Sequence, residues 1–363
     1  MKNILLLVPR MNIGGAESYV ALVARSLKLL GYNVFIASGG GALANELQQE
    51  GIKHFFLPIR LSKFISGLLL KRIIKKYNID LIHANSEAAG IVAVKTRNKY
   101  NFNIPIVYTA HGVLPAKVKN IINQVDKIIA VSDFSKHSAI KEGFSAEKIQ
   151  VVYNGVDINK FKPNQQDKKL LREKYNIPQE AFTMIIVSRI KNLRNKGHQH
   201  LLDVLKNYEV SKKWHLIVIG KGKGFSDLKR KIKEYHLQDR VHLLGHKTDV
   251  ENYIDIADVM VLPSYFETFG LVLAEGMAMQ KPAIAFNVGG ISEVISDKET
   301  GFLVKYNDDD DLVNKINRLA QDKDLCSKMG INARKKVEKD FANQIMIKKI
   351  IEVYNEIIDN KTN

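Results

Sequence analysis

The chain has 363 residues, a length that predicts two globular domains. Its composition, 45% hydrophobic and 26% charged, excludes long disordered segments. Its formal net charge of +17 is uneven, because residues 1–165 hold 22 basic against 10 acidic side chains; such an electropositive half favours nucleic acid, an anionic membrane surface or an acidic substrate as partner. A single cysteine, Cys326, excludes a disulfide framework or a cysteine-rich zinc site and fits a cytoplasmic protein.

Short apolar runs alternate with helical stretches along the first half of the chain. The runs that predict strands are Ile4–Val8, Asn33–Ser38, Ile52–Leu57, Leu81–His83, Ile106–Thr109, Lys127–Val131 and Gln150–Tyr153. Between the first two, Ala16–Leu30 has helical spacing. Continuous apolar strands separated by helices indicate a parallel sheet covered on both faces, so this half is predicted to be a doubly wound α/β domain.

A polar stretch with a proline, Phe161–Asp167, predicts the linker between the domains. The same alternation then restarts, with strands expected at Met184–Val187, His215–Ile219, Val241–Leu243, Val259–Leu262 and Ala283–Phe286. We therefore expect domains at residues 1–160 and 161–340, followed by a C-terminal segment 341–363. Two such sheets in tandem favour a ligand site in a cleft at the carboxyl ends of their strands.

No apolar run approaches the ~20 residues of a membrane span. The five-residue run before Pro9 is also too short for a signal peptide. We expect a cytoplasmic protein that at most lies on the inner face of the cell membrane.

Gly14-Gly15-Ala16-Glu17 lies between the first predicted strand and helix. Glycines there let the backbone approach a ligand, and the free N–H groups of a helix start favour an anion. A tight turn without a ligand explains the pattern equally well.

Two basic residues follow the Met184–Val187 strand. Arg189 is expected at the cleft edge, and Lys196 is expected to open the next helix. A guanidinium, an ammonium and a helix terminus together predict a diphosphate clamp that needs no metal. The alternative is a solvated surface pair.

Glu267 and Glu275 flank the predicted helix start near Gly270. Eight helical residues would separate them by about 12 Å. Paired glycosidase carboxylates lie ~5–10 Å apart, so two roles along an elongated ligand fit better. Glu275 is either a surface side chain or, in this apolar helix, a carboxylate that needs a partner.

His111 follows the Ile106–Thr109 strand. A histidine at a strand end is a candidate general base or hydrogen-bond donor, although a lone histidine is more often structural.

Together these residues resemble glycosyltransferase family 4, in the family's order and over nearly the whole chain. The segments that carry the resemblance are Gly14-Gly15-Ala16-Glu17, His111-Gly112, Val131-Ser132, Asn154-Gly155-Val156-Asp157, Arg189 with Lys196-Gly197, Glu267 with Glu275, and Gly289-Gly290-Ile291-Ser292-Glu293. The resemblance implies the GT-B fold, with two Rossmann-like domains and a final helix, here Phe341–Ile358, that returns to the first domain.

The resemblance also implies roles. Arg189 and Lys196 would hold the donor diphosphate, Glu275 the ribose, and Glu267 the sugar near its anomeric centre. The backbone of Thr268, Phe269, Gly270 and Leu271 would bind sugar and phosphate, Gly14 and Gly15 would meet the phosphates, and His111 would hydrogen-bond the transferred sugar. The expected donor is a nucleotide-diphosphate sugar, with UDP as the nucleotide, and retention of anomeric configuration is implied without cofactor or metal. The implied acceptor is a saccharide or lipid-linked molecule bound by the first domain.

The segment Arg60–Tyr77 mixes five lysine and arginine side chains after Arg60 with leucine, isoleucine and phenylalanine. It predicts either a helix on an anionic membrane or a core-packing helix with a solvated basic face. Two other functions stay open: a nucleotide-sugar epimerase of similar fold, and a nucleic-acid-binding protein. The latter is disfavoured because the sequence has no helix-turn-helix, zinc-finger or RNA-binding aromatic signature.

Overall fold

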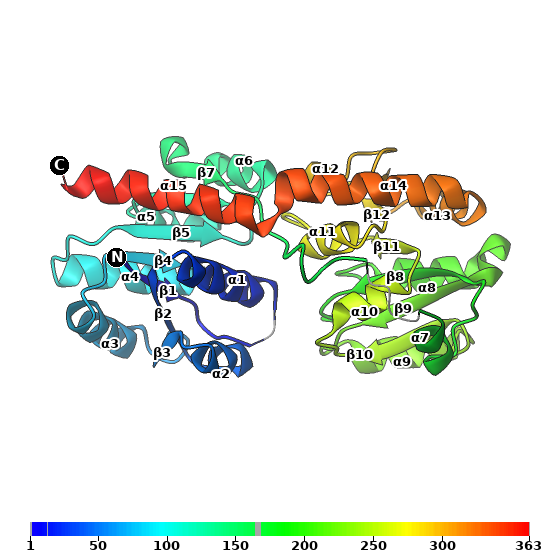
Figure 1. Ribbon diagram of the computed structural model, residues 1–363, viewed down its shortest axis with the longest axis horizontal. Coiled ribbons are helices and arrows are strands. Elements are labelled where there is room, and N and C mark those ends of the chain that lie inside the picture. Colours follow the sequence, from blue (N-terminus) through cyan, green and yellow to red (C-terminus); the bar gives the residue numbers. More distant parts are fainter. Residues whose placement is uncertain (1, 13, 164–167, 363) are drawn as a thin grey trace. The chain divides into compact units, whose positions relative to one another are not determined.

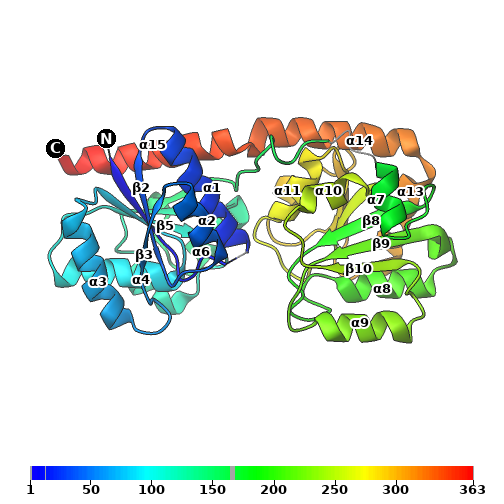
Figure 2. The same ribbon diagram turned by 60° about the horizontal axis from the view of Figure 1, so that its bottom comes forward.

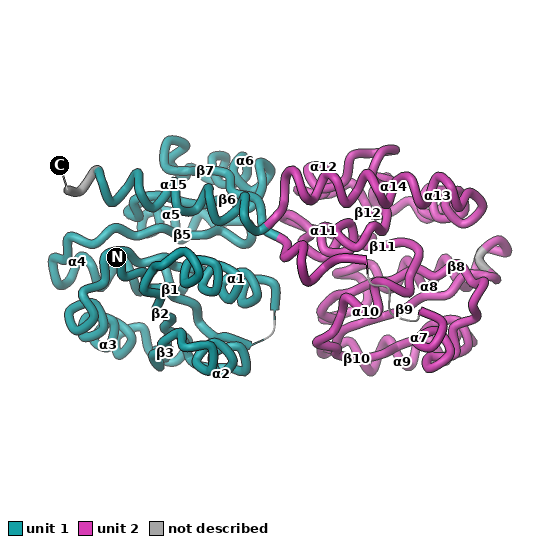
Figure 3. Tube along the Cα trace, viewed as in Figure 1, with its two compact units in different colours: residues 1–155, 343–363 teal, residues 156–342 magenta. Residues whose placement is uncertain are grey.

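The computed structural model describes residues 2–12, 14–163 and 168–362 and divides the chain into two compact units. Unit 1 comprises residues 1–155 and 343–363, and unit 2 comprises residues 156–342 (Figure 3). Residues 164–167 of the predicted linker lie outside the described residues. Each unit is an α/β structure around one all-parallel sheet, which confirms the predicted fold class (Figure 1).

Unit 1 has a seven-stranded sheet in the order β3-β2-β1-β4-β5-β6-β7. Its strands are β1 (Asn3–Leu7), β2 (Asn33–Ser38), β3 (Lys53–Phe56), β4 (Leu81–Ala84), β5 (Ile106–Ala110), β6 (Lys127–Ala130) and β7 (Ile149–Val151). Its helices are α1 (Gly15–Leu29), α2 (Ala42–Gln49), α3 (Lys63–Lys76), α4 (Glu87–Lys99), α5 (Lys119–Ile122), α6 (Asp133–Lys141) and α15 (Asn343–Thr362).

The two faces of this sheet pack against different helices. In β1, Leu5 and Leu7 join a core with α3 and α4, whereas Ile4 and Leu6 join a core with α1, α2 and α15. Every one of these four side chains is fully buried, because successive strand residues point to opposite faces and both faces are covered. Figure 2 shows the helices on the two sides of the sheet.

Unit 2 has a six-stranded sheet in the order β10-β9-β8-β11-β12-β13. Its strands are β8 (Phe182–Val187), β9 (Trp214–Ile219), β10 (Val241–Gly245), β11 (Val259–Leu262), β12 (Ala283–Phe286) and β13 (Gly301–Val304). Its helices are α7 (Lys168–Lys174), α8 (His198–Asn207), α9 (Phe225–Glu234), α10 (Val250–Asp255), α11 (Leu271–Ala278), α12 (Ile291–Val294), α13 (Asp309–Gln321) and α14 (Lys323–Lys336). A π-helical turn, Val337–Phe341, ends the unit.

The final helix begins at Asn343, so Phe341 does not belong to it. Its buried residues recur on one face, and they pack with α1 in the core of unit 1. They are Met346, Ile347, Ile350, Val353, Tyr354, Ile357 and Ile358. No helix in the described part of the chain combines the length and hydropathy that crossing a bilayer requires.

Candidate donor site

The chain order of the strands in unit 2 reverses between β8 and β11. From β8 the chain builds outward through β9 and β10, and from β11 it builds the other way through β12 and β13. β8 and β11 are neighbouring parallel strands. Open α/β sheets bind ligands at such a switch point, beyond the carboxyl ends of the strands. A ligand site is therefore expected at the loops that follow these strands, residues 188–197 and 263–270.

Lys196 and Glu267 come from these two loops and form an ion pair between Nζ and Oε1. The hydroxyl of Ser264 donates a hydrogen bond of 3.0 Å to the same Glu267 oxygen. The side chains are 25% and 12% exposed, so the pair is partly shielded from water yet open to a ligand. Lys196 was predicted to open the next helix, and this was wrong. The helix α8 begins at His198 behind Gly197, and Lys196 lies in the preceding turn.

Two glycines hold these loops in close contact. Gly197 has a left-handed φ of 78°, and a Cβ there would lie 2.0 Å from the carbonyl oxygen of Pro263. Gly289 has a φ of 57°, and a Cβ there would lie 1.8 Å from the carbonyl oxygen of Glu267. The N–H of Gly290 donates to that same oxygen at 3.1 Å. The backbone of Glu267 is therefore fixed from behind by the β12–α12 loop.

The segment Thr268–Leu271, whose backbone is expected to bind sugar and phosphate, leads directly into α11. Gly270 caps this helix in a left-handed conformation, with a φ of 87° and without a side-chain cap. A helix start without a capping side chain leaves N–H donors for a ligand. Phe269 is buried and packs edge-on against Phe341, with ring centroids 5.3 Å apart. Its side chain therefore anchors this segment in the core, and its backbone is the candidate ligand contact.

Glu275 lies in the body of α11, as expected, and has different neighbours from Glu267. Burial raises its pKa to about 7, while Lys160 lowers it and Glu251 raises it further. Glu267 instead has Lys196 and Ser264 beside it. The two carboxylates therefore have different partners, as two separate roles along a ligand would require.

Arg189 lies two residues after β8 and is exposed. No described residue forms an ion pair with its guanidinium. The five donors of this side chain are thus available to an anion that approaches the loop.

Gly14, Gly15 and His111 belong to unit 1, at the carboxyl ends of β1 and β5. The strand order of unit 1 reverses between β1 and β4, so the Gly14–Gly15 turn follows a switch-point strand. Gly14 caps α1 without a side-chain hydrogen bond. A Cβ on Gly15 would meet nothing within 4 Å, so packing does not require a glycine at this position.

His111 packs edge-on against Tyr19, with ring centroids 4.7 Å apart. Burial lowers its pKa to about 4. The imidazole is therefore neutral near pH 7, where it offers one donor and one acceptor rather than a positive charge.

Sequence reasoning missed two residues that support the site. Ser264 has no motif of its own, although its place between a strand end and Glu267 is a usable signal. The structural role of Gly289 was also not predicted, because it depends on an approach to a residue 22 positions earlier. Among the described residues, no three His, Cys, Asp or Glu side chains gather as a metal site would require.

Comparisons with known proteins agree with the two units. Residues 13–160 match the family model described as "Glycosyltransferase Family 4", and residues 167–336 match the one described as "Glycosyl transferases group 1". The "Uncharacterized glycosyltransferase MJ1178" of Methanocaldococcus jannaschii is 31% identical over 80% of this chain and 79% of its own.

Two further similarities cover more of the chain. The Escherichia coli "UDP-Gal:alpha-D-GlcNAc-diphosphoundecaprenol alpha-1,3-galactosyltransferase" is 27% identical over 90% of this chain and 89% of its own. The crystal structure of Anabaena Alr3699/HepE in complex with UDP-glucose superposes with a TM-score of 0.88, at 25% identity, over 98% of this chain and 100% of its own. The fold and the family models thus define a glycosyltransferase of the GT-B architecture. The chain belongs to glycosyltransferase family 4.

Proposed function

We propose that this glycosyltransferase moves a hexosyl or related sugar from a UDP-sugar to a saccharide or lipid-linked acceptor, with retention of anomeric configuration and without a metal. The observation that carries the proposal is the Lys196–Glu267 pair at the β8–β11 switch point, beside the start of α11. Here a cation suited to a diphosphate and a carboxylate suited to sugar hydroxyls lie side by side.

In the proposed step, the bond between the anomeric carbon and the diphosphate oxygen breaks, and UDP leaves with the electron pair. The acceptor hydroxyl oxygen bonds to the same face of that carbon, and its proton passes to the departing phosphate oxygen. Lys196 spends one donor on Glu267 and keeps two for phosphate oxygens. Together with Arg189 it stabilises the negative charge that grows on the leaving group, so catalysis is mainly electrostatic and positional.

The remaining residues keep the roles that the family resemblance implies. The N–H groups from Thr268 to Leu271 bind sugar and phosphate, and Glu275 accepts hydrogen bonds from the ribose. In unit 1, the Gly14–Gly15 backbone binds phosphate, and the neutral His111 hydrogen-bonds the sugar. Metal independence is supported by this chemistry, because cations and helix N–H groups can neutralise a diphosphate themselves.

The printed names of similar proteins support the donor and acceptor classes. The Anabaena structure contains UDP-glucose, and the name of the Escherichia coli relative includes both UDP-Gal and a diphosphoundecaprenol-linked sugar. We therefore propose a UDP-sugar donor and a role in bacterial surface polysaccharide or glycolipid biosynthesis. A lipid-linked acceptor would require work at the inner face of the cell membrane, so the proposed location is cytoplasmic and peripheral. The family assignment favours neither the epimerase nor the nucleic-acid-binding alternative.

A thermal-shift screen of UDP-, GDP- and ADP-sugars tests the donor, because a ligand that binds only the native state raises the melting temperature. We expect stabilisation by UDP-sugars that persists in EDTA. Donor turnover with a simple saccharide acceptor, followed by NMR of the product anomer, tests retention. Stabilisation by GDP- or ADP-sugars alone would contradict the UDP assignment, and an inverted product would contradict the mechanism.

A further inference from the structure

The outward face of α3 carries both apolar and basic side chains. Phe64, Ile65 and Leu68 of this helix, together with Leu61 just before its N-cap, recur at helical spacing, and they are 66%, 50%, 39% and 83% exposed. On a helix that merely covers a sheet, this face is normally polar. The opposite face of α3 packs into the core of unit 1, where Leu70, Ile73 and Ile74 are buried.

Basic residues continue the same face toward the end of the helix. Arg72, Lys75 and Lys76 are exposed and follow the apolar residues at helical spacing. Residues 51–79 contain seven lysine and arginine side chains and no aspartate or glutamate. The charge of this surface is therefore uncompensated within its own segment.

The helix α4 adds to this surface. Gly67 brings the two helices close, since a Cβ there would lie 3.2 Å from Oγ1 of Thr96. Lys99 of α4 places Nζ 5.0 Å from the centre of the Phe64 ring. An aromatic ring thus lies exposed with a lysine beside it, as at the headgroup level of a membrane interface.

We propose that this α3 face, formed by Leu61, Phe64, Ile65, Leu68, Arg72, Lys75 and Lys76, docks unit 1 on an anionic lipid bilayer. The apolar side chains enter the boundary between headgroups and acyl chains, and the basic ones lie over anionic headgroups. A second copy of the chain fits this face poorly, because its basic residues would oppose each other. A nucleic acid would use the charges and leave the apolar side chains in water.

This inference rests on the proposed membrane location and gives it a surface, and it does not depend on which sugar is transferred. Co-sedimentation of the full chain with vesicles of phosphatidylcholine alone, or with added phosphatidylglycerol, tests it. We expect binding only to the anionic vesicles, weakened by salt.

Two variants separate the contributions of charge and apolar surface. Arg72→Gln with Lys75→Gln and Lys76→Gln should weaken vesicle binding by about tenfold or more. The matched control is Lys229→Gln with Arg230→Gln and Lys233→Gln, which removes the same three charges from exposed positions of α9. Phe64→Ser with Ile65→Ser should weaken binding by a similar factor. Its control is Leu170→Ser with Ile331→Ser, at apolar positions that are 62% and 43% exposed.

The outcomes are distinct. Absence of vesicle binding at low salt, or binding that neither variant weakens, overturns the proposal. Binding to double-stranded DNA or polyglutamate that equals vesicle binding and is insensitive to Phe64→Ser with Ile65→Ser also overturns it, because the surface then acts as a plain anion site. UDP binding measured on the same variants reports on the donor site separately, so loss of membrane docking alone leaves the proposed transfer reaction standing.

Discussion

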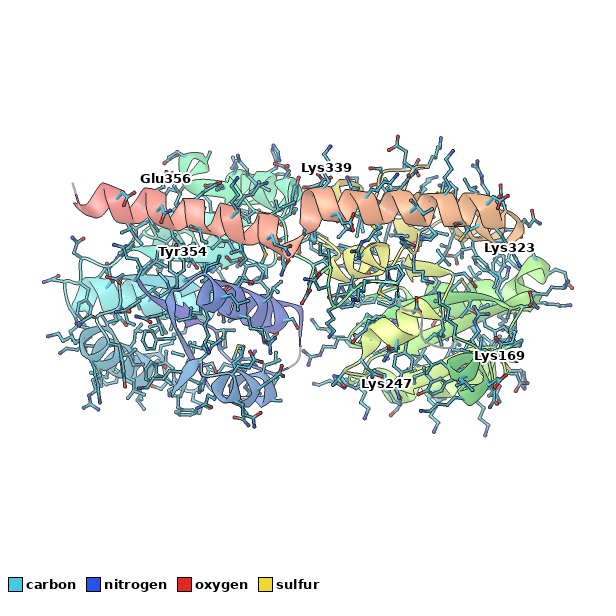
Figure 4. All side chains as sticks on the ribbon, in the orientation of Figure 1. Lys169, Lys247, Lys323, Lys339, Tyr354 and Glu356 are labelled. Atoms are coloured by element: carbon cyan, nitrogen blue, oxygen red, sulfur yellow. The ribbon has the colours of Figure 1, made fainter. Side chains whose placement is uncertain are left out.

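The hydroxyl of Tyr354 in α15 lies 2.6 Å from Nδ1 of His83 in β4, although 271 residues separate the two in the sequence. The other ring nitrogen of His83 lies 2.6 Å from Oγ1 of Thr109 in β5. All three side chains are fully buried, so the last helix of the chain completes a polar network inside unit 1 (Tyr354 is labelled in Figure 4).

Tyr354→Phe should lower the free energy of unfolding by about 1–3 kcal/mol, because it leaves a buried ring nitrogen of His83 without its partner. Urea denaturation followed by circular dichroism measures the loss. Tyr32→Phe, at a half-buried tyrosine of the same unit, is the control. Equal stability of Tyr354→Phe and the unmodified chain would mean that the hydroxyl contributes nothing to the network.

Acid should destabilise the protein through two histidines that are buried in their neutral form. Burial lowers the pKa of His83 to about 3 and of His111 to about 4, from an ordinary value of 6.5. At these two histidines the unfolded chain binds more protons than the native one between pH 6.5 and 4, so their contribution to stability is lost as the pH falls through this window.

His111→Gln should flatten this pH dependence by up to about 1.4 kcal/mol per pH unit between pH 6 and 4.5. Unfolding measured at several pH values checks the slope. His137→Gln, at an exposed histidine of α6, is the control. An unaltered slope in His111→Gln would show that His111 is not buried in its neutral form.

Glu275 should give the opposite dependence. Its pKa is raised from 4.5 to about 7, so at this carboxyl group the native chain binds more protons than the unfolded chain between these values, and its contribution to stability falls as the pH rises through them. Glu275→Gln should remove about 1–2 kcal/mol of this loss, because the residue is half-buried and nearby water screens part of the effect. The UDP-sugar affinity of the unmodified chain should rise between pH 6 and 8, because the ionised carboxylate accepts hydrogen bonds from the ribose. Glu275→Gln should lack this rise. Stability curves of identical shape for both proteins would contradict the assignment.

Gly289→Ala should disturb the donor site through the backbone. The new methyl group would collide with the carbonyl oxygen of Glu267, at a position that also has a positive φ. We expect destabilisation by about 2 kcal/mol or more and weaker UDP binding. Gly15→Ala meets no described atom, so it should leave the melting temperature unchanged. A Gly289→Ala protein with normal stability would show that the loop can move away.

Much of the fold could be predicted, because fully buried parallel strands appear as uninterrupted apolar runs. β2, β11 and β12 have the predicted bounds, and the continuous run at β8 was found with its first two residues missing. β13 was missed, since Gly301–Val304 is only four residues long and begins with a glycine. A rule that accepted runs this short as strands would also assign strands to many surface turns.

The site could be predicted only where the sequence marks it. Lys196 and Glu267 stand out because charged residues follow two apolar strands, and the structure brings them together. The start of α8 was misplaced because a lysine is a good helix former, whereas Gly197 with its left-handed φ ends the loop one residue later. Contacts such as Tyr354–His83 join distant segments and leave no local pattern.

We propose that Lys196, held by Glu267 at the β8–β11 switch point, binds the diphosphate of a UDP-sugar. Isothermal titration of UDP into the unmodified chain and into Lys196→Ala, both in EDTA, tests it most directly, with the exposed Lys206→Ala of α8 as the control. We predict binding to the unmodified chain and to Lys206→Ala, and affinity weaker by about tenfold or more in Lys196→Ala, because a charge-assisted hydrogen bond to phosphate is lost. Equal affinity of Lys196→Ala and the unmodified chain, or no UDP binding at all, would contradict this role of Lys196.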